Sequence, residues 1–273
     1  MDFLKVLDET AERVKNTVKP LLKSPIAGKT YGIGAGGDAK KHIDLEAEKT
    51  IVSTLRRKGL EFTLISEETG IRRCGNRPSY YVTTDPIDGT TNLLRGIPFA
   101  CSSIAISTTA HVGSVEAGVV VDLFHSVTYL AQRNRGAFRN SERIEPAQID
   151  NLDDAVVGVD INSCDTSPRL AQLLGQIKHV RHLGANALEL CYVADGTADG
   201  FIDVRGKLRT TDIAAAILII EESNAIITDS RGVPLSRPLS PTTTIDFIAA
   251  GNRPLHQKIL TALGTDQTHV DSH

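Results

Sequence analysis

Residues 80–92 read YYVTTDPIDGTTN, an aromatic and β-branched run that passes directly into two aspartates, Asp85 and Asp88. The first five residues have the composition of a β-strand, and a strand ending here would deliver both carboxylates to one rim of a sheet. Pro86 fixes the backbone between the aspartates, and Gly89 allows a ligand to approach the backbone closely. The stretch therefore predicts an acidic, ligand-binding turn at the end of a strand.

The residues around this turn favour an anion held beside a cation. Thr90 and Thr91 offer hydroxyls and free amides at the predicted start of a short helix, where the helix dipole attracts negative charge. Carboxylates as close as Asp85 and Asp88 repel each other unless a cation neutralises them, and Mg2+ prefers oxygen ligands of this kind. Asp-Pro and Asp-Gly pairs are also good turn formers, so the motif alone leaves a purely structural role open.

Further acidic residues lie beside predicted elements elsewhere in the chain. Glu67 and Glu68 follow an apolar strand predicted over residues 61–65, and Asp212 lies at the start of a strongly apolar helix predicted over residues 211–222. Each has an ordinary explanation by itself, a solvated turn for the glutamates and a helix N-cap for the aspartate. If they converge on the two aspartates of the turn, together they can hold a metal ion.

The rest of the chain alternates between predicted helices and strands. Apolar residues at three- and four-residue steps predict a first helix that runs until about residues 20–25, and the glycine-rich residues 30–37 predict a loop ending at Asp38, the expected N-cap of a second helix. Strand-like stretches follow near residues 101–107, 112–121 and 126–131. From residue 155 onward, the pattern predicts strands 155–160, 178–183, 199–204, 225–228 and 245–250, and helices 167–177, 185–195, 211–222 and 253–263. Layered helices and sheets are expected, with a weak subdomain boundary near residues 145–154 and a polar tail after Gly264.

Composition argues against several classes of partner. The 273 residues carry a formal net charge of −3, and their 30 basic and 33 acidic residues are mixed along the sequence. Without a polybasic block, we expect neither nucleic acid nor a membrane as a partner. Residues 1–24 lack the apolar run of a signal peptide or membrane span, so we expect a cytoplasmic protein. Free cysteines fit that compartment better than a zinc site, because the four cysteines are far apart: Cys74, Cys101, Cys164 and Cys191.

These motifs make the chain resemble the inositol monophosphatase superfamily, and in particular its archaeal-type (class IV) fructose-1,6-bisphosphatases with inositol-1-monophosphatase activity. The resemblance covers nearly the whole chain and is carried by Ser66-Glu67-Glu68, Asp85-Pro-Ile-Asp-Gly-Thr-Thr-Asn92, Gly96-Ile-Pro-Phe99, Gly136-Ala-Phe138 and Thr211-Asp-Ile-Ala-Ala215. It implies an α+β fold, a layered α-β-α-β-α sandwich with two packed subdomains. Residues 1–150 would carry most metal ligands, and residues 151–273 would carry Asp212 and the substrate arginines.

The resemblance also implies roles for individual positions. The metal ligands would be Glu67, Asp85, the Ile87 carbonyl, Asp88 and Asp212, with Asp44 and Asp38 near a more weakly held ion. Two or three Mg2+ ions, replaceable by Mn2+, would activate water and neutralise the leaving oxygen without a covalent intermediate. The catalytic residues would be Glu67, Thr90 and Asp44, of which Glu67 and Thr90 orient the water. Substrate contacts would come from Asp88, Gly89, Thr90, Arg181, Gly184, Ala185, Asn186, Arg205 and Asp212.

Departures from the family pattern bear on the substrate. Thr211 stands where the family usually has tryptophan, and Ala216 where it has glycine, so packing near Asp212 is expected to differ. Arg205 lies seven residues before Asp212, where inositol-selective relatives have an acid. Because arginine prefers phosphate to hydroxyl, Arg205 and Arg181 suggest a second, non-reacting phosphate on the substrate. A surface ion pair is the alternative role for either arginine.

The sequence therefore predicts hydrolysis of fructose 1,6-bisphosphate at its 1-phosphate, with inositol 1-phosphate as a secondary substrate. The resemblance further suggests a cytoplasmic homodimer of carbohydrate metabolism, acting in gluconeogenesis. Two alternatives stay open, a 3'(2'),5'-bisphosphate nucleotidase of the same superfamily and a non-catalytic sugar-phosphate-binding regulator. A haloacid-dehalogenase-type phosphatase, with an aspartyl nucleophile, is disfavoured because two residues rather than one separate Asp85 from Asp88.

Overall fold

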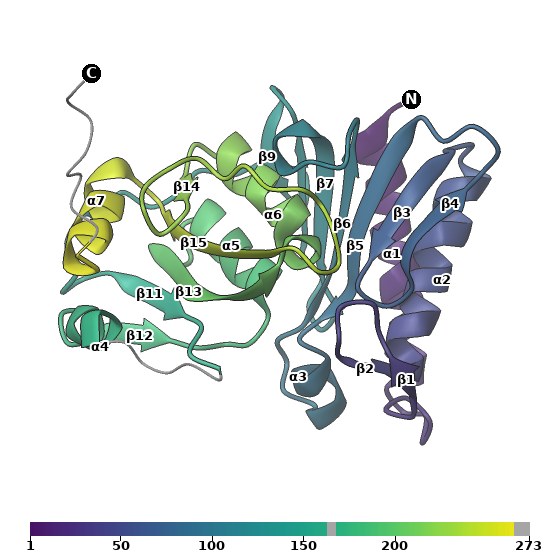
Figure 1. Ribbon diagram of the computed structural model, residues 1–273, viewed down its shortest axis with the longest axis horizontal. Helices are drawn as coiled ribbons and strands as arrows, with labels where there is room; N and C mark the ends of the chain where they lie inside the picture. Colours follow the sequence, from purple (N-terminus) through teal and green to yellow (C-terminus); the bar gives the residue numbers. More distant parts are fainter. Residues whose placement is uncertain (163–167, 265–273) are drawn as a thin grey trace.

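The computed structural model describes residues 1–162 and 168–264. It confirms the predicted α+β sandwich, because two large sheets alternate with three layers of helices along the long axis of the molecule (Figure 1). Two expectations, the polar tail after Gly264 and the state of Cys164, lie outside the described residues.

The larger sheet has eight strands in the order β10-β9-β8-β7-β6-β5-β3-β4. Its neighbouring strands run antiparallel except β3 and β5, which are parallel. The parallel pair sets Ser66 opposite Thr84, so the acidic residues that follow these two positions meet at one edge of the sheet. The strands are β3 (Phe62–Ser66), β4 (Gly70–Cys74), β5 (Tyr80–Asp88), β6 (Cys101–Ser107), β7 (Val115–Asp122), β8 (Thr128–Gln132), β9 (Gly136–Arg139) and β10 (Glu142–Arg143).

The second sheet has five strands in the order β12-β11-β13-β15-β14. Two of its pairings, β11 with β12 and β11 with β13, are parallel, and the other two are antiparallel. Its outer face is covered by α4 (Pro168–Leu174) and α7 (Arg253–Ala262), whose Leu170 and Leu255 share a core with Val157. The strands are β11 (Val156–Val159), β12 (His179–Arg181), β13 (Gly200–Arg209), β14 (Ile226–Thr228) and β15 (Thr244–Ala250).

The helices of the other two layers differ in burial as their sequences predict. The outer face of the larger sheet carries α1 (Phe3–Leu21) and α2 (His42–Arg57), which bury one apolar side each. Between the two sheets lie α5 (Asn186–Ala194) and α6 (Thr210–Glu222). Every residue of α6 from Thr210 to Ile220 is buried. A helix that is apolar all round needs cover on all sides, and the two sheets supply it.

The glycine-rich segment differs from its expected loop. Residues 30–33 form β1 (Thr30–Ile33), which pairs antiparallel with β2 (Ala39–Lys41), and positive φ angles at Gly32 and Gly37 allow the bend. The expectation that Asp38 caps the second helix is wrong. The N-cap is Lys41, whose backbone amide donates to Asp44 in the first turn. The strand expected from residue 112 also starts later, because η1 (Val112–Ser114) precedes β7.

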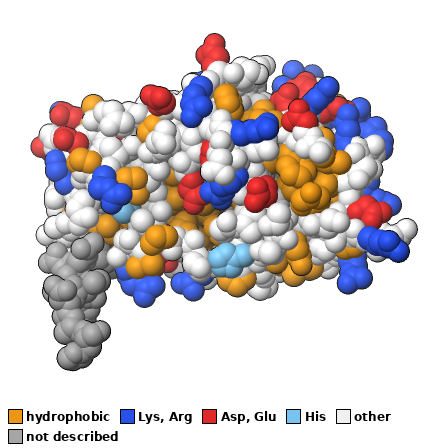
Figure 2. Space-filling view, turned by 90° about the horizontal axis from the view of Figure 1, so that it is seen from above, with side chains coloured by type: hydrophobic (Ala, Val, Ile, Leu, Met, Phe, Trp, Pro, Cys, Tyr) orange, Lys and Arg blue, Asp and Glu red, His pale blue; other side chains and the backbone are white. Residues whose placement is uncertain are grey.

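The surface is mixed in charge, as the composition predicts. On the face in Figure 2, basic and acidic side chains are interspersed with apolar ones. No helix within residues 1–162 and 168–264 is long and apolar enough to cross a membrane.

Candidate active site

A cleft of about 1170 Å3 receives residues from both halves of the chain. It is lined by the 34–41 region, the ends of β3 and β5, the start of α6, and the strand-end segments of the second sheet. All predicted site residues except Arg181 and Ala185 line this cleft: Asp38, Asp44, Glu67, Asp85, Ile87, Asp88, Gly89, Thr90, Gly184, Asn186, Arg205 and Asp212.

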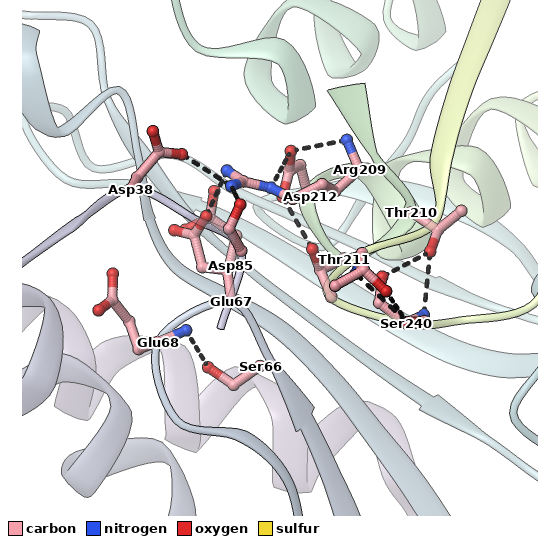
Figure 3. Close-up of polar contacts among 12 residues, drawn as sticks. Asp38, Ser66, Glu67, Glu68, Asp85, Arg209, Thr210, Thr211, Asp212 and Ser240 are labelled. Atoms are coloured by element: carbon pink, nitrogen blue, oxygen red, sulfur yellow. Dashed lines mark hydrogen bonds and ion pairs between the residues drawn. The ribbon is translucent and has the colours of Figure 1, made fainter. Parts of the chain in front are cut away.

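Three of the predicted metal ligands converge within this cleft. Glu67, Asp85 and Asp212 each present a carboxylate oxygen, and these oxygens all lie within 4.8 Å of one another. Glu67 follows β3, Asp85 lies in β5 and Asp212 lies in the first turn of α6 (Figure 3). Three segments far apart in sequence thus form a cluster of hard oxygen donors, a set that fits Mg2+ or Mn2+.

A bulge in β5 explains how Asp85 and Asp88 both reach the cleft. Side chains three residues apart on a regular strand point to opposite faces. Here Asp85 pairs with Ser103 and Asp88 pairs with Cys101, so one extra residue stands in β5 between the two positions. Pro86, which cannot donate a ladder hydrogen bond, lies within this irregular segment.

Crowding and burial perturb these carboxyl groups strongly. Burial, reinforced by the carboxylates of Glu67, Asp88 and Asp212, raises the pKa of Asp85 well above its ordinary value. Burial also raises the pKa of Asp88 to about 8, although the Ala187 amide, which donates to its Oδ2 at 2.7 Å, opposes the shift. A bound divalent cation would offset this repulsion, which supports the cluster as a cation site.

Thr90 and its neighbours form a second part of the site. The Thr90 hydroxyl lies 2.9 Å from the Ile87 carbonyl oxygen and 3.1 Å from Asp44 Oδ1. Thr90 begins α3 (Thr90–Arg95), and Gly89 precedes it with a φ of 86°. A Cβ at Gly89 would meet the Gly184 and Phe99 carbonyl oxygens at 3.1 Å, so the backbone here is packed closely. These contacts bring Thr90, Asp44 and Ile87 together.

The predicted substrate arginine Arg205 also lines the cleft. Its guanidinium is buried and forms ion pairs with Asp160 at 2.7 Å and Asp203 at 2.5 Å, and it donates to the Asn162 carbonyl. Gly184 and Asn186 line the same cleft, and Asn92 holds this segment through a 2.7 Å hydrogen bond to the Leu183 carbonyl.

Arg181 and Ala185 do not line the cleft. Arg181 lines a separate cavity of about 310 Å3, beside Tyr192 and Phe201, and its guanidinium donates to the Val180 carbonyl. Ala185 is buried, although its Cβ would lie 3.2 Å from a Cβ at position 89. Of the two predicted arginines, the structure therefore places only Arg205 in the cleft that holds the acidic cluster.

The sequence reasoning missed a cation within the acidic cluster, Arg209. Its guanidinium contacts Glu67, Asp212 and the exposed Asp38 (Figure 3). The spacing of an arginine three residues before Asp212, at the start of a helix, was the available signal. Arginine and aspartate are often found three residues apart near a helix end, so this spacing alone does not predict that Arg209 joins the acidic cluster.

The raised pKa values predict how stability depends on pH. The pKa is raised by burial to about 6 for Asp44, about 7 for Glu67 and about 8 for Asp88, so the metal-free folded chain binds more protons than the unfolded chain. Stability of the metal-free protein should therefore fall as the pH rises from about 4, the pKa of the unfolded carboxyls, to about 8, the highest of these folded values. Because Mg2+ needs the ionised carboxylates, its stabilising effect should grow over the same range. Thermal unfolding with EDTA or Mg2+ at each pH measures both trends, and a pH-independent metal-free Tm would contradict the assignment.

Comparisons relate this chain to known proteins. The profile of the inositol monophosphatase family matches residues 3–267. A fructose-1,6-bisphosphatase/inositol-1-monophosphatase from Methanothermobacter thermautotrophicus is 36% identical over 93% of this chain and 93% of its own. A bifunctional NADP phosphatase/NAD kinase from Methanococcus maripaludis is 34% identical over 97% of this chain, which spans 50% of that protein. A crystal structure of an inositol monophosphatase–fructose 1,6-bisphosphatase is similar with a TM-score of 0.81 and 29% identity, covering 96% of this chain and 100% of that one.

Proposed function

Because this chain belongs to the inositol monophosphatase family and is a phosphatase, we propose that it hydrolyses the 1-phosphate of fructose 1,6-bisphosphate, and inositol 1-phosphate secondarily, with Mg2+ or Mn2+ in the acidic cluster. The observation that carries the proposal is the convergence of Glu67, Asp85 and Asp212 oxygens within 4.8 Å in a cleft large enough for a sugar phosphate. We also propose that the enzyme is a cytoplasmic homodimer that acts in gluconeogenesis, as the resemblance suggests.

The metal-binding residues would be Glu67, Asp85, Asp88, Asp212 and the Ile87 carbonyl, with Asp44 and Asp38 near a weaker ion. Divalent ions held there would lower the pKa of an attacking water and offset the charge of the phosphate and the leaving oxygen. The carboxylates of the chain would hold these cations in place, and such oxygen ligands match the preference of Mg2+.

The chain's own residues would orient the reacting groups. Thr90 and Glu67 would hold the attacking water, and Asp44 fixes the Thr90 hydroxyl through their 3.1 Å hydrogen bond. The amides of Gly89 and Thr90, at the start of α3, would donate to phosphate oxygens. Close packing around Gly89 leaves this turn little freedom to move, which favours catalysis by a preorganised site.

The wall of the cleft formed by residues of the second sheet and its connections would select the substrate. Arg205 is held by two carboxylates, Asp160 and Asp203, and a rigid guanidinium is suited to a fixed phosphate or hydroxyl of the sugar. His182 and Lys207 line the same cleft and add basic groups to that wall. This combination supports a substrate with a second phosphate, and Arg205 is the residue expected to recognise it.

Arg205→Ala should reduce kcat/KM for fructose 1,6-bisphosphate by about 30-fold, or about 2 kcal/mol, because a charged hydrogen bond to the second phosphate is lost. Two carboxylates would remain opposite that phosphate and add repulsion. Inositol 1-phosphate, which has no second phosphate, should change by less than about 3-fold. Phosphate-release assays on both substrates measure the ratio.

Two companion variants make this test specific. Arg205→Lys keeps the positive charge and guards against loss of folding, since a broken buried ion pair is costly. Arg181→Ala removes the other predicted arginine, which lines the separate cavity. An unchanged substrate ratio in Arg205→Ala contradicts the role of Arg205, and a ratio that changes only in Arg181→Ala transfers that role to the second cavity.

A nucleotide phosphate is the second candidate substrate. Nearly the whole chain is similar to a bifunctional NADP phosphatase/NAD kinase, which supports a nucleotide 2'-phosphate as substrate. The 3'(2'),5'-bisphosphate nucleotide considered from the sequence is also a nucleotide phosphate. A substrate panel with NADP+, a nucleotide 3',5'-bisphosphate, fructose 1,6-bisphosphate and inositol 1-phosphate separates these candidates. Binding of sugar phosphate without turnover at saturating Mg2+ would instead favour a non-catalytic regulator.

A further inference from the structure

Arg209 joins a loop to the acidic cluster. We propose that Arg209 is a positioning residue, which holds the loop of residues 34–38 (the 34–38 loop) against Glu67 and Asp212 and fixes those two carboxylates for metal binding. The inference rests on the proposed metal site, and it concerns a residue outside the predicted ligand and substrate set.

The contacts of Arg209 use three sides of its guanidinium. One Nη lies 2.5 Å from Glu67 Oε2, and the other lies 2.7 Å from Asp38 Oδ2 and 2.9 Å from the Gly36 carbonyl oxygen. The Nε lies 3.3 Å from Asp212 Oδ1, and the Arg209 backbone amide donates to Asp212 Oδ2. Its side chain is only 17% exposed. A planar guanidinium can bridge such partners at once, whereas a lysine ammonium acts as a single point charge.

The 34–38 loop is shaped to accept this guanidinium. A Cβ at Gly36 would lie 2.4 Å from an Arg209 Nη and 3.2 Å from the Glu67 Cβ. The φ of Gly36 is not in the left-handed region, so glycine is needed here for space and not for conformation. The loop backbone also pairs with the residues after β3, through the Gly36 amide to the Glu67 carbonyl at 2.8 Å and the Ala35 amide to the Glu68 carbonyl at 3.3 Å.

These contacts connect three segments that the metal site needs together. Glu67 comes from the end of β3 and Asp212 from the start of α6, and the same guanidinium contacts both. Arg209 binds Oε2 of Glu67, and its Nε contacts both carboxylate oxygens of Asp212 (Figure 3). Without it, the Glu67 side chain would lose its charged partner and gain freedom to leave the cluster, and the loop would lose its side-chain anchor.

Three variants and one control test the proposal. Arg209→Gln removes the charge, Arg209→Lys keeps the charge but cannot bridge, and Gly36→Ala keeps Arg209 but places a methyl group where its guanidinium lies. Arg231→Gln is the control for loss of an arginine–aspartate ion pair, because the exposed Arg231 pairs with Asp229 and does not line the cleft. Circular dichroism and Tm establish that each full-length variant is folded.

The first measurement is hydrogen exchange at the amides of Ala35 and Gly36, with and without Mg2+. All three test variants should exchange at least about 10-fold faster than wild type in the metal-free protein, while Arg231→Gln matches wild type. The second is calorimetric titration with Mg2+, for which Arg209→Gln and Gly36→Ala should bind about 10-fold more weakly.

Two results would overturn the proposal. Wild-type exchange rates in all three variants would show that the loop does not depend on Arg209. Tighter Mg2+ binding by Arg209→Gln would show that the guanidinium competes with the metal instead of positioning its ligands. If wild type fails to bind Mg2+, the metal site itself is wrong, whereas faster loop exchange in the variants would still support the contact between Arg209 and the loop. Should Arg209→Gln fail to fold, Arg209→Lys and Gly36→Ala carry the same test.

Discussion

Asp88→Asn should fold normally and lose about 10²- to 10³-fold of kcat on fructose 1,6-bisphosphate and inositol 1-phosphate alike. Asparagine has nearly the same shape, and its Oδ1 can still accept the Ala187 amide that now donates to Asp88 Oδ2. What the variant loses is a negative charge beside Asp85 and Asp212, where the proposed cations need it. Steady-state assays at saturating Mg2+, with circular dichroism on the same sample, measure the two effects separately.

The matched control for this variant is Asp199→Asn. Asp199 is also a buried aspartate that accepts a backbone amide, from Val156 at 2.8 Å, but it does not line the cleft. Its substitution should leave turnover within about 3-fold of wild type. Near-normal turnover in Asp88→Asn would rule out the ligand role of Asp88. An equal loss in both variants would mean that activity reports on general packing rather than on the site.

Removing divalent cations should reduce activity at least about 10²-fold, and Mg2+ or Mn2+ should restore it. Without a cation, the crowded carboxyls favour protonation, because burial and mutual repulsion raise the pKa of Asp85 and Asp88. The protein is treated with EDTA, dialysed, and assayed before and after each cation is returned. Circular dichroism before the cation is added confirms that the fold is intact.

Two outcomes would change the mechanism. Full activity in excess EDTA would contradict metal dependence. Trapping of a phospho-aspartate would revive an aspartyl nucleophile, the chemistry that the Asp85–Asp88 spacing disfavours. Ca2+ is a useful comparison ion, because its larger size and looser geometry suit the same oxygen ligands without matching the compact site expected for Mg2+.

The sequence predicted the layered fold because most of its signals are local. The all-round apolar pattern of residues 213–220 could only suit a helix covered on every side, and α6 lies between the two sheets. Strand composition likewise located β5 together with its acidic turn. The loop predicted for the glycine-rich residues 30–37 is wrong in part, because residues 30–33 form β1 by pairing with β2. Local composition does not predict such pairing.

The acidic cluster was predicted through motifs, but the residues around it depend on long-range contacts. Arg209 reaches Asp38, 171 residues earlier in the chain, and no local pattern encodes that distance. Arg181, in contrast, was predicted to contact the substrate but does not line the cleft. The resemblance implies a position beside the sugar, whereas in the structure Arg181 ends β12 and lines a separate cavity. The roles of these residues stay predictions until the variants are assayed.

The buried position of α6 has a consequence for how such a protein can change. The first turn of this helix carries Asp212 in the cleft, and its remaining length is packed against strands from both halves of the chain. A substitution that changes side-chain volume along α6 is therefore expected to shift Asp212, a proposed metal ligand, because the packed helix moves as a unit. A chimera that joins the first half of one relative to the second half of another would have to pack α6 against a sheet with different side chains. The two halves are therefore expected to be inherited together.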